Sequence, residues 1–148
     1  MARDVKYTFD TNIVTGYKLE RLPRKFYMSA VVLSELMTVA AGKSEFDAYV
    51  DTWQRHEKDG TLIVPTTADW LMASKALYRL AQDRRTTAGG KAPRWPPAAK
   101  QEVTMDALLA ACARREKVIV VTDDKDYTAI QHYCTGLEIM KGKEYFGK

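Results

Sequence analysis

The sequence predicts an α/β fold in three layers, with helices on both faces of a central parallel β-sheet. Short runs of β-branched and other apolar residues alternate with longer helical patterns, which is the order expected of βαβ units. Hydrophobic residues make up 46% of the 148 residues, enough for a conventional buried core. We find no internal repeat, so we predict a single domain over residues 1–148.

Five segments are predicted to be strands: residues 5–9, 26–28, 61–64, 118–121 and 137–140. Helices are predicted over residues 30–41, 44–58 and 68–83, and a fourth helix includes residues 103–116. Ser29 and Thr67 can cap the first and third of these helices with their hydroxyl groups. Gly42 and Gly60 follow the first two helices, at positions where glycine commonly ends a helix.

Residues 84–100, RRTTAGGKAPRWPPAAK, are rich in glycine, proline and cations and are predicted to form an exposed loop within the domain. Cations fit phosphates, and an indole can stack on an unpaired base. The candidate residues for contact with a nucleic acid are therefore Arg84, Arg85, Arg94 and Trp95. The alternative is a solvated loop whose Trp95 packs against the core.

The net charge, the lengths of the apolar runs and the cysteine spacing restrict the classes of protein to which the chain can belong. The formal net charge is +4 and the pI is about 9.0, which favours a polyanionic partner, although many basic proteins bind none. No apolar run approaches the roughly 20 residues of a membrane span, and the N-terminus lacks a signal-peptide pattern. Cys112 and Cys134 have neither zinc-ligand spacing nor the density of a disulfide scaffold. We therefore expect a cytoplasmic protein without a membrane segment.

Two carboxylates occupy positions that stability alone does not favour. Asp10 directly follows the first predicted strand, and sites in open α/β sheets form beyond the carboxyl ends of strands. The alternative is that Asp10 caps the next helix, and both roles can hold together. Glu35 lies on a largely apolar helical face, where an ionised carboxylate needs a cation, a proton or a metal. The alternative for Glu35 is a salt bridge to a basic side chain.

Two further segments bring acids towards the same edge. Asp106 precedes the end of its helix by about ten residues, roughly 15 Å, which matches a following strand about 13 Å tall. In the alternative, Thr104 or Asp106 only starts the helix. The stretch VVTDDKDY places Asp123, Asp124 and Asp126 just past the strand at 118–121, where a solvated acidic turn is the alternative.

Four elements of the chain can thus deliver a carboxylate to one edge of one sheet. Their mutual repulsion would be severe without a counterion. Hard oxygen ligands of this kind select Mg²⁺ or Mn²⁺. A cluster of this type commonly serves phosphoryl chemistry, in which the metal activates water and neutralises phosphate charge.

The motifs DTN, SEL, DALLAACA and TDDKDY, in this order, resemble those of PIN-domain nucleases, particularly the VapC-like toxin ribonucleases of toxin–antitoxin pairs. The resemblance covers nearly the whole chain and implies hydrolysis of RNA phosphodiesters with Mg²⁺ or Mn²⁺. The implied catalytic and metal-binding residues are Asp10, Glu35, Asp106 and Asp124. Asn12 and Thr122 would hold these carboxylates by hydrogen bonds, whereas Asp126 matches a second, more variable acid. A cognate antitoxin and a homodimer are also implied.

Other functions fit the sequence less well. An inactive domain that binds metal and docks RNA or protein, or a housekeeping RNA-processing nuclease, would have the same fold. A receiver-like phosphoacceptor domain would give Glu35 no role. A metal-free ribonuclease would need His56 and His132, the only two histidines, to meet, and nothing in the sequence favours that.

Overall fold

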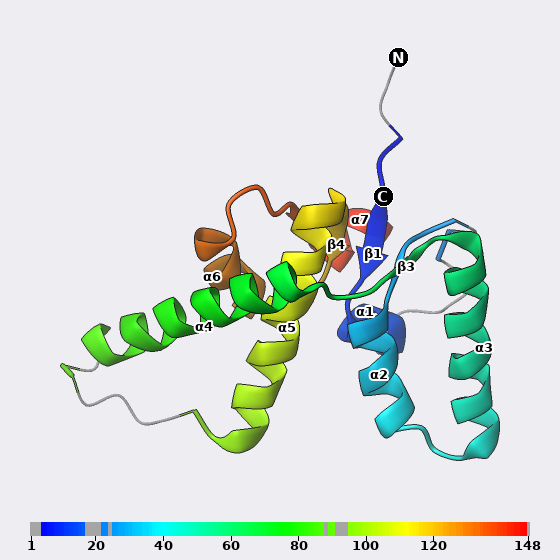
Figure 1. Cartoon of the computed structure of the whole chain (residues 1–148), viewed down its shortest axis with the longest axis horizontal. Coiled ribbons are helices and arrows are strands. Elements are labelled where there is room, and N and C mark those ends of the chain that lie inside the picture. The colour runs from blue at the N-terminus through cyan, green and yellow to red at the C-terminus, as the bar shows by residue number, and fades with distance from the viewer. Residues whose placement is uncertain (1–3, 17–21, 24, 88, 91–94, 148) are drawn as a thin grey trace.

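The computed structural model describes residues 4–16, 22–23, 25–87, 89–90 and 95–147, and it has the predicted α/β architecture with parallel strands flanked by helices (Figure 1). The strands are β1 (Tyr7–Phe9), β2 (Met28–Ser29), β3 (Leu62–Ile63), β4 (Ile119–Val121) and β5 (Ile139–Met140). Each overlaps a predicted strand but is shorter than predicted.

All strand pairs are parallel. One sheet has the order β1-β4-β5, and β2 pairs with β3 in a second. A parallel bridge between Thr8 and Tyr27 connects the two, with the Tyr27 amide donating to the Tyr7 carbonyl at 2.9 Å. The strands therefore lie in the order β3-β2-β1-β4-β5, and their carboxyl ends share one edge.

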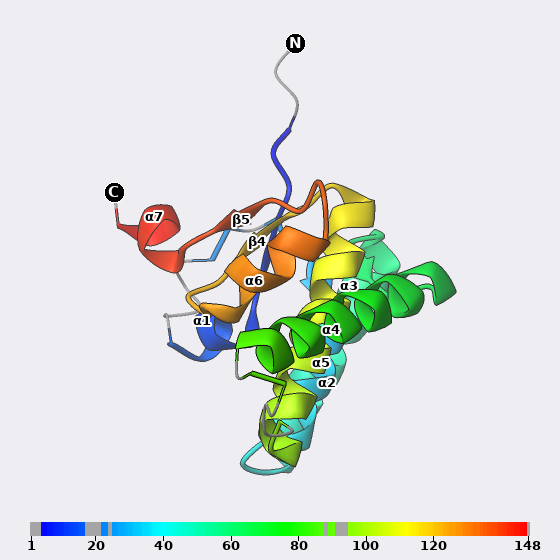
Figure 2. The same cartoon turned by 90° about the vertical axis from the view of Figure 1, so that its left-hand side faces the viewer.

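The helices are α1 (Thr11–Gly16), α2 (Ala30–Thr38), α3 (Lys43–Asp59), α4 (Thr67–Thr87), α5 (Pro97–Glu116), α6 (Asp126–Tyr133) and α7 (Gly142–Phe146). α6 and α7 were not predicted, and α1 was expected only as a helix that Asp10 could cap, because such short helices carry little periodicity. α2 packs against α3, whereas α4, α5 and α6 pack against one another (Figures 1 and 2). None of the helices in the described part of the chain is long and apolar enough to cross a membrane.

The centre of the core is the second half of α5. Every residue from Ala107 to Ala113 is buried, so this part of the helix is enclosed on all sides. A helix in that position needs small and apolar side chains all round, which explains its alanine-rich sequence. Phe9, Val120 and Val121 of the central strands complete the same core. Asp106 is the residue that directly precedes this buried stretch.

Of the four predicted helix caps, two are confirmed and two are wrong. The helix α2 ends at Thr38, three residues before its predicted end, and Gly42 is instead the N-cap of α3. Ser29 Oγ accepts hydrogen bonds from the amides of Val31 and Val32 at the start of α2. Gly60 ends α3 with φ of 74°, in the left-handed region that favours glycine. At α4 the prediction of Thr67 is wrong by one residue, because Thr66 and Asp69 exchange hydrogen bonds there in a reciprocal capping box.

The basic loop predicted over residues 84–100 is shorter in the structure. Both adjacent helices extend into it, so that Arg84 and Arg85 belong to the last turn of α4. Cations at a helix C-terminus are favoured by the helix dipole, which is why the helix continues through them. It ends before Gly89 and Gly90, which both adopt positive φ.

Trp95 packs against the core, as the alternative for it predicted, and its contact with RNA stays a prediction. Its indole is half-buried and packs against the hydrophobic core. The guanidinium of Arg84 lies over its ring, 5.0 Å from the centroid, in a cation–π contact. Arg94 lies outside the described residues.

Arg115 connects the end of α5 to the start of α4. Its Nε donates to both carboxylate oxygens of the buried Asp69, at 3.1 and 2.9 Å, and its Nη2 donates to the Val64 carbonyl. Replacing Arg115 with Ala is expected to lower the free energy of unfolding by about 1 to 3 kcal/mol, because the Asp69 charge is left buried without its partner. Urea unfolding would measure this, with the exposed Lys75→Ala as control; equal stabilities would contradict the assignment.

Candidate functional site

The structure brings three of the four predicted carboxylates together. Asp10 follows β1, Asp124 follows the neighbouring parallel strand β4, and Asp106 projects from α5. One carboxylate oxygen from each lies within 4.8 Å of the other two. We call these three residues the acidic cluster. The convergence predicted from strand ends and helix length is therefore confirmed for this set.

Asp10 both caps a helix and belongs to the acidic cluster. Its Oδ1 accepts the Thr11 amide at 2.8 Å, where α1 begins. Its Oδ2 accepts the Thr122 hydroxyl at 2.8 Å. The side chain is buried, and burial raises the pKa of Asp10 although these hydrogen bonds oppose the shift. Both carboxylate oxygens are thus fixed in orientation by neighbouring donors.

Thr122 links two members of the acidic cluster, as the sequence predicted for a supporting residue. Its hydroxyl donates to Asp10 and accepts the Asp124 amide at 3.0 Å. Asn12, the other predicted support, accepts a long hydrogen bond of 3.5 Å from the Asp123 amide and not from a member of the acidic cluster. Thr122 is therefore the stronger of the two supports.

Asp106 is buried in the middle of α5, so the interpretation that it starts this helix is wrong. Its Oδ1 accepts the hydroxyl of Tyr127 at 3.4 Å. Its Oδ2 is buried, and no hydrogen-bond donor among the described residues reaches it. Burial, followed by the charges of Asp10 and Asp124, raises the pKa of Asp106 to about 9. A buried carboxylate oxygen that accepts no hydrogen bond is a suitable ligand for a cation.

Tyr127 is a site residue that the sequence interpretation missed. Its side chain is fully buried beneath the acidic cluster, and its hydroxyl approaches both Asp106 and Asp10. The available signal was its place directly after Asp126 in TDDKDY, where a tyrosine in the core needs a polar partner for its hydroxyl.

The three acids of the TDDKDY turn have different positions. Asp124 belongs to the acidic cluster, and its Oδ1 accepts the Asp126 amide at 2.9 Å. Asp123 instead accepts the Gly142 amide at 2.9 Å, which ties the turn to the start of α7. Asp126 is exposed at the start of α6, and burial together with the charges of Asp124 and Glu102 raises its pKa.

Glu35 lies beside the acidic cluster but outside the set of three converging oxygens. It is half-buried on α2, and burial together with the Asp10 charge raises its pKa to about 7. The alternative of a salt bridge is not supported, since no Lys or Arg in the described ranges forms an ion pair with it. Its role as a metal ligand stays a prediction.

The chemistry of the acidic cluster fits a divalent metal ion. All of its ligand atoms are carboxylate oxygens, the donors that Mg²⁺ and Mn²⁺ prefer. Buried like charges at this separation raise one another's pKa unless a cation compensates them. The acidic cluster can therefore bind a metal ion.

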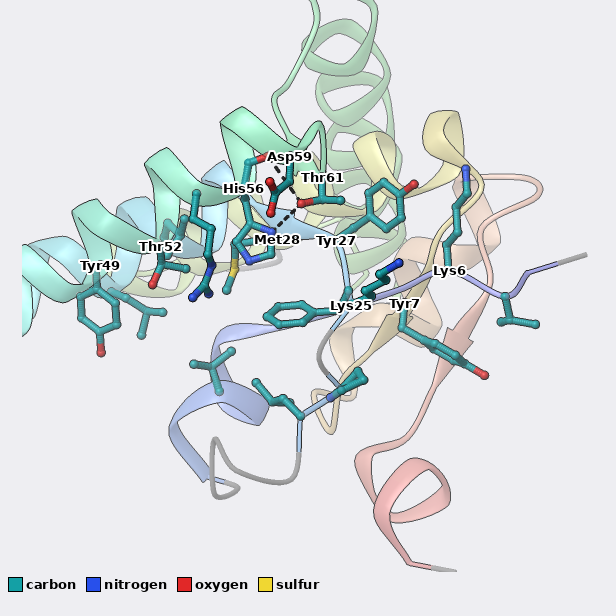
Figure 3. Close-up of a pocket in the computed structure, with 18 of the residues that line it drawn as sticks. Lys6, Tyr7, Lys25, Tyr27, Met28, Tyr49, Thr52, His56, Asp59 and Thr61 are labelled. Atoms are coloured by element: carbon teal, nitrogen blue, oxygen red, sulfur yellow. Dashed lines mark hydrogen bonds between the residues drawn. The ribbon is translucent and has the colours of Figure 1, made fainter.

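The two histidines are separate from this site and from each other. His56 lines a pocket of about 1270 Å³ beside α3, where its Nδ1 lies 2.7 Å from the Thr61 hydroxyl and its ring meets Phe26 edge-on (Figure 3). His132 is exposed on α6, on the opposite side of the molecule from α3 (Figure 1). A catalytic pair of histidines is excluded by this arrangement.

Solved structures with this fold include the DNA-bound VapBC of Salmonella typhimurium, with 15% identity, a TM-score of 0.55 and coverage of 93% of this chain and 98% of that one. FitAB bound to the IR36 DNA fragment has 16% identity, a TM-score of 0.53 and coverage of 91% and 94%. VapBC-5 of Mycobacterium tuberculosis, from the VapBC family of toxin-antitoxin systems, has 19% identity, a TM-score of 0.51 and coverage of 93% and 99%.

No curated protein matches the sequence significantly. Identities this low to the solved structures establish a shared fold only. The sequence itself matches the PIN domain over residues 9–133, a segment that contains the whole acidic cluster. The chain belongs to the PIN domain family.

Proposed function

We propose that this PIN domain is an endoribonuclease that requires Mg²⁺ or Mn²⁺ and acts as the toxin of a toxin–antitoxin pair. The observation that carries the proposal is the acidic cluster, in which three carboxylates from separate elements place their oxygens within 4.8 Å. The net charge of +4 supports a polyanionic substrate, because the positive charge offsets the repulsion that these acids exert on a phosphate backbone.

Each residue of the site would have a separate role in phosphodiester hydrolysis. Asp10, Asp106 and Asp124 would hold the metal ion, which supplies charge neutralisation at the phosphate and activation of water. The Thr122 hydroxyl keeps Asp10 in place and positions the backbone of Asp124. Tyr127 supports Asp106 from the core side. Fixed ligands of this kind act without reorganisation during the reaction.

Glu35 is the candidate proton acceptor. Burial, followed by the Asp10 charge, raises its pKa to about 7 in the metal-free protein, so the carboxyl group can gain or lose a proton near neutral pH. It lies close enough to the acidic cluster for the Asp10 charge to act on it, but outside the set of closest oxygens. Such a group typically contributes about 10²- to 10⁴-fold to the rate.

The toxin role rests on the fold shared with proteins solved as VapBC complexes. A cognate antitoxin would block the acidic cluster, and an Arg or Lys side chain is the complement to three buried carboxylates. A gene for a small DNA-binding protein directly upstream would support this partner. Nuclease activity without growth arrest on expression would argue for a housekeeping enzyme.

The purified protein is expected to cut single-stranded RNA with Mg²⁺ or Mn²⁺ and to stop when a chelator removes the metal. Gel analysis of end-labelled RNA would measure this, and restored activity after adding excess metal is the control for irreversible damage. Metal-dependent stabilisation without any cutting would instead indicate a non-catalytic module. Cutting that continues in chelator would contradict the metal requirement.

A further inference from the structure

A second pocket, of about 720 Å³, lies between α4, α5 and α6. The two long helices α4 and α5 diverge towards the segment that connects them, and α6 lies beside them (Figures 1 and 2). The buried side chains of Leu80 and Val103 give the pocket an apolar floor. Arg84 and Trp95 form one wall through their cation–π contact.

This pocket adjoins the acidic cluster. Glu102, which lines it, is one helical turn before Asp106 on α5, or about 6 Å along the axis. Asp126, which also lines it, donates its amide to Asp124 at 2.9 Å. The Glu102 charge raises the pKa of both Glu35 and Asp126, in keeping with this proximity. A group bound in the pocket would therefore be a direct neighbour of a phosphate at the acidic cluster.

The pocket's charges select the kind of group it can hold. Asp83, Glu102 and Asp126 are exposed carboxylates around it, and Asp83 accepts the Tyr133 hydroxyl. Carboxylates repel a phosphate but accept hydrogen bonds from the amino and ring N–H groups of an uncharged base. A planar base can stack on an aromatic ring or on a guanidinium plane, and the Arg84–Trp95 pair offers both.

Among the four bases, guanine is the best complement. Its Watson–Crick edge presents two neighbouring donors, N1–H and N2–H, which can bind one carboxylate in a bidentate manner. Uracil presents one N–H between two carbonyl oxygens, which the carboxylates repel. Adenine and cytosine, each with one amino group, are intermediate.

We propose that the pocket is a base-specific subsite that binds an unpaired guanine next to the phosphodiester to be cut, with Glu102 as its main acceptor and Arg84–Trp95 as its stacking wall. This inference rests on the proposed ribonuclease function. It goes beyond that function by assigning the sequence preference of cutting to named residues outside the acidic cluster.

The test measures the binding of RNA and the cutting of RNA in separate experiments. In a protein with Trp53→Phe and Trp70→Phe, Trp95 is the remaining indole, and its fluorescence would be titrated in chelator with five-nucleotide RNAs that carry a central G or U. We expect about five- to tenfold tighter binding of the G pentamer. Glu102→Gln should remove most of this difference, whereas Glu57→Gln on α3, far from the pocket in sequence, should keep it.

Cutting is then mapped by sequencing the ends released from a random single-stranded RNA pool. The expected result is enrichment of G beside the cut, which Glu102→Gln redistributes towards the other bases. Fluorescence that responds equally to both pentamers, or an unchanged preference in Glu102→Gln, overturns the subsite while leaving the nuclease in place. A protein that binds the G pentamer selectively but never cuts RNA supports the subsite and overturns the proposed function.

Discussion

Replacing Asp10 with Asn is expected to lower RNA cutting by at least about 1000-fold while the protein stays folded. Asn has nearly the shape of Asp, and its carbonyl oxygen can still accept the Thr11 amide that starts α1. It lacks the negative charge, however, and its amide nitrogen cannot bind a metal ion as a carboxylate oxygen does. Asp10 and Asp124 follow neighbouring strands, so losing either leaves the cation with an incomplete set of ligands.

The measurement is the initial rate of cutting of a labelled RNA at saturating Mn²⁺, beside circular dichroism and thermal unfolding without metal. Asp59→Asn, at the exposed end of α3, is the matched control and should keep the wild-type rate. Thermal stability of Asp10→Asn should be unchanged or higher, because burial raises the pKa of Asp10 and its charge is therefore unfavourable in the folded state. Undiminished cutting by a folded Asp10→Asn protein would remove the proposed function.

The parts of the fold that sequence predicted best are those fixed by a local pattern. The run of apolar residues before Asp10 and before Thr122 marks two strands, and a parallel pair brings their carboxyl ends to the same edge. The rise of about 1.5 Å per helical residue then places Asp106 about 15 Å from the C-terminal end of α5. Because these rules depend on chain geometry alone, the acidic cluster was predictable without any long-range packing information.

The features that could not be predicted from the sequence depend on contacts between residues that are far apart in the chain. The hydroxyl of Tyr127 meets Asp106 across 21 positions of sequence, and no pattern near either residue encodes the contact. Arg115 lies in the last turn of α5 and binds Asp69 across 46 positions, and no local pattern encodes this contact. The packing of Trp95 against the protein was likewise unpredictable from composition, since the Arg84 beside its ring comes from α4.

Asp106→Asn is expected to stabilise the metal-free protein at pH 8 and to abolish its response to metal. The ordinary pKa of the carboxyl is 3.8, and burial beside two other acids raises it to about 9 in the folded state. Between these values the folded protein binds a proton that the unfolded chain does not, so stability falls as pH rises through this window. Asn carries no charge at any pH and therefore escapes the penalty, which the shift from 3.8 makes about 5 to 6 kcal/mol at pH 8.

Thermal unfolding from pH 4 to pH 9 in chelator should show the wild type losing stability more steeply than Asp106→Asn, with the two curves meeting near pH 4. Added Mn²⁺ should narrow the difference at pH 8, because a ligand at 100 times its dissociation constant stabilises the wild type by about 2.7 kcal/mol and the variant not at all. Asp47→Asn, exposed on α3, should follow the wild type throughout. If Asp106→Asn were instead less stable than the wild type in chelator at pH 8, Asp106 would be held by a compensating partner, and the acidic cluster would be a structural feature and not a metal site.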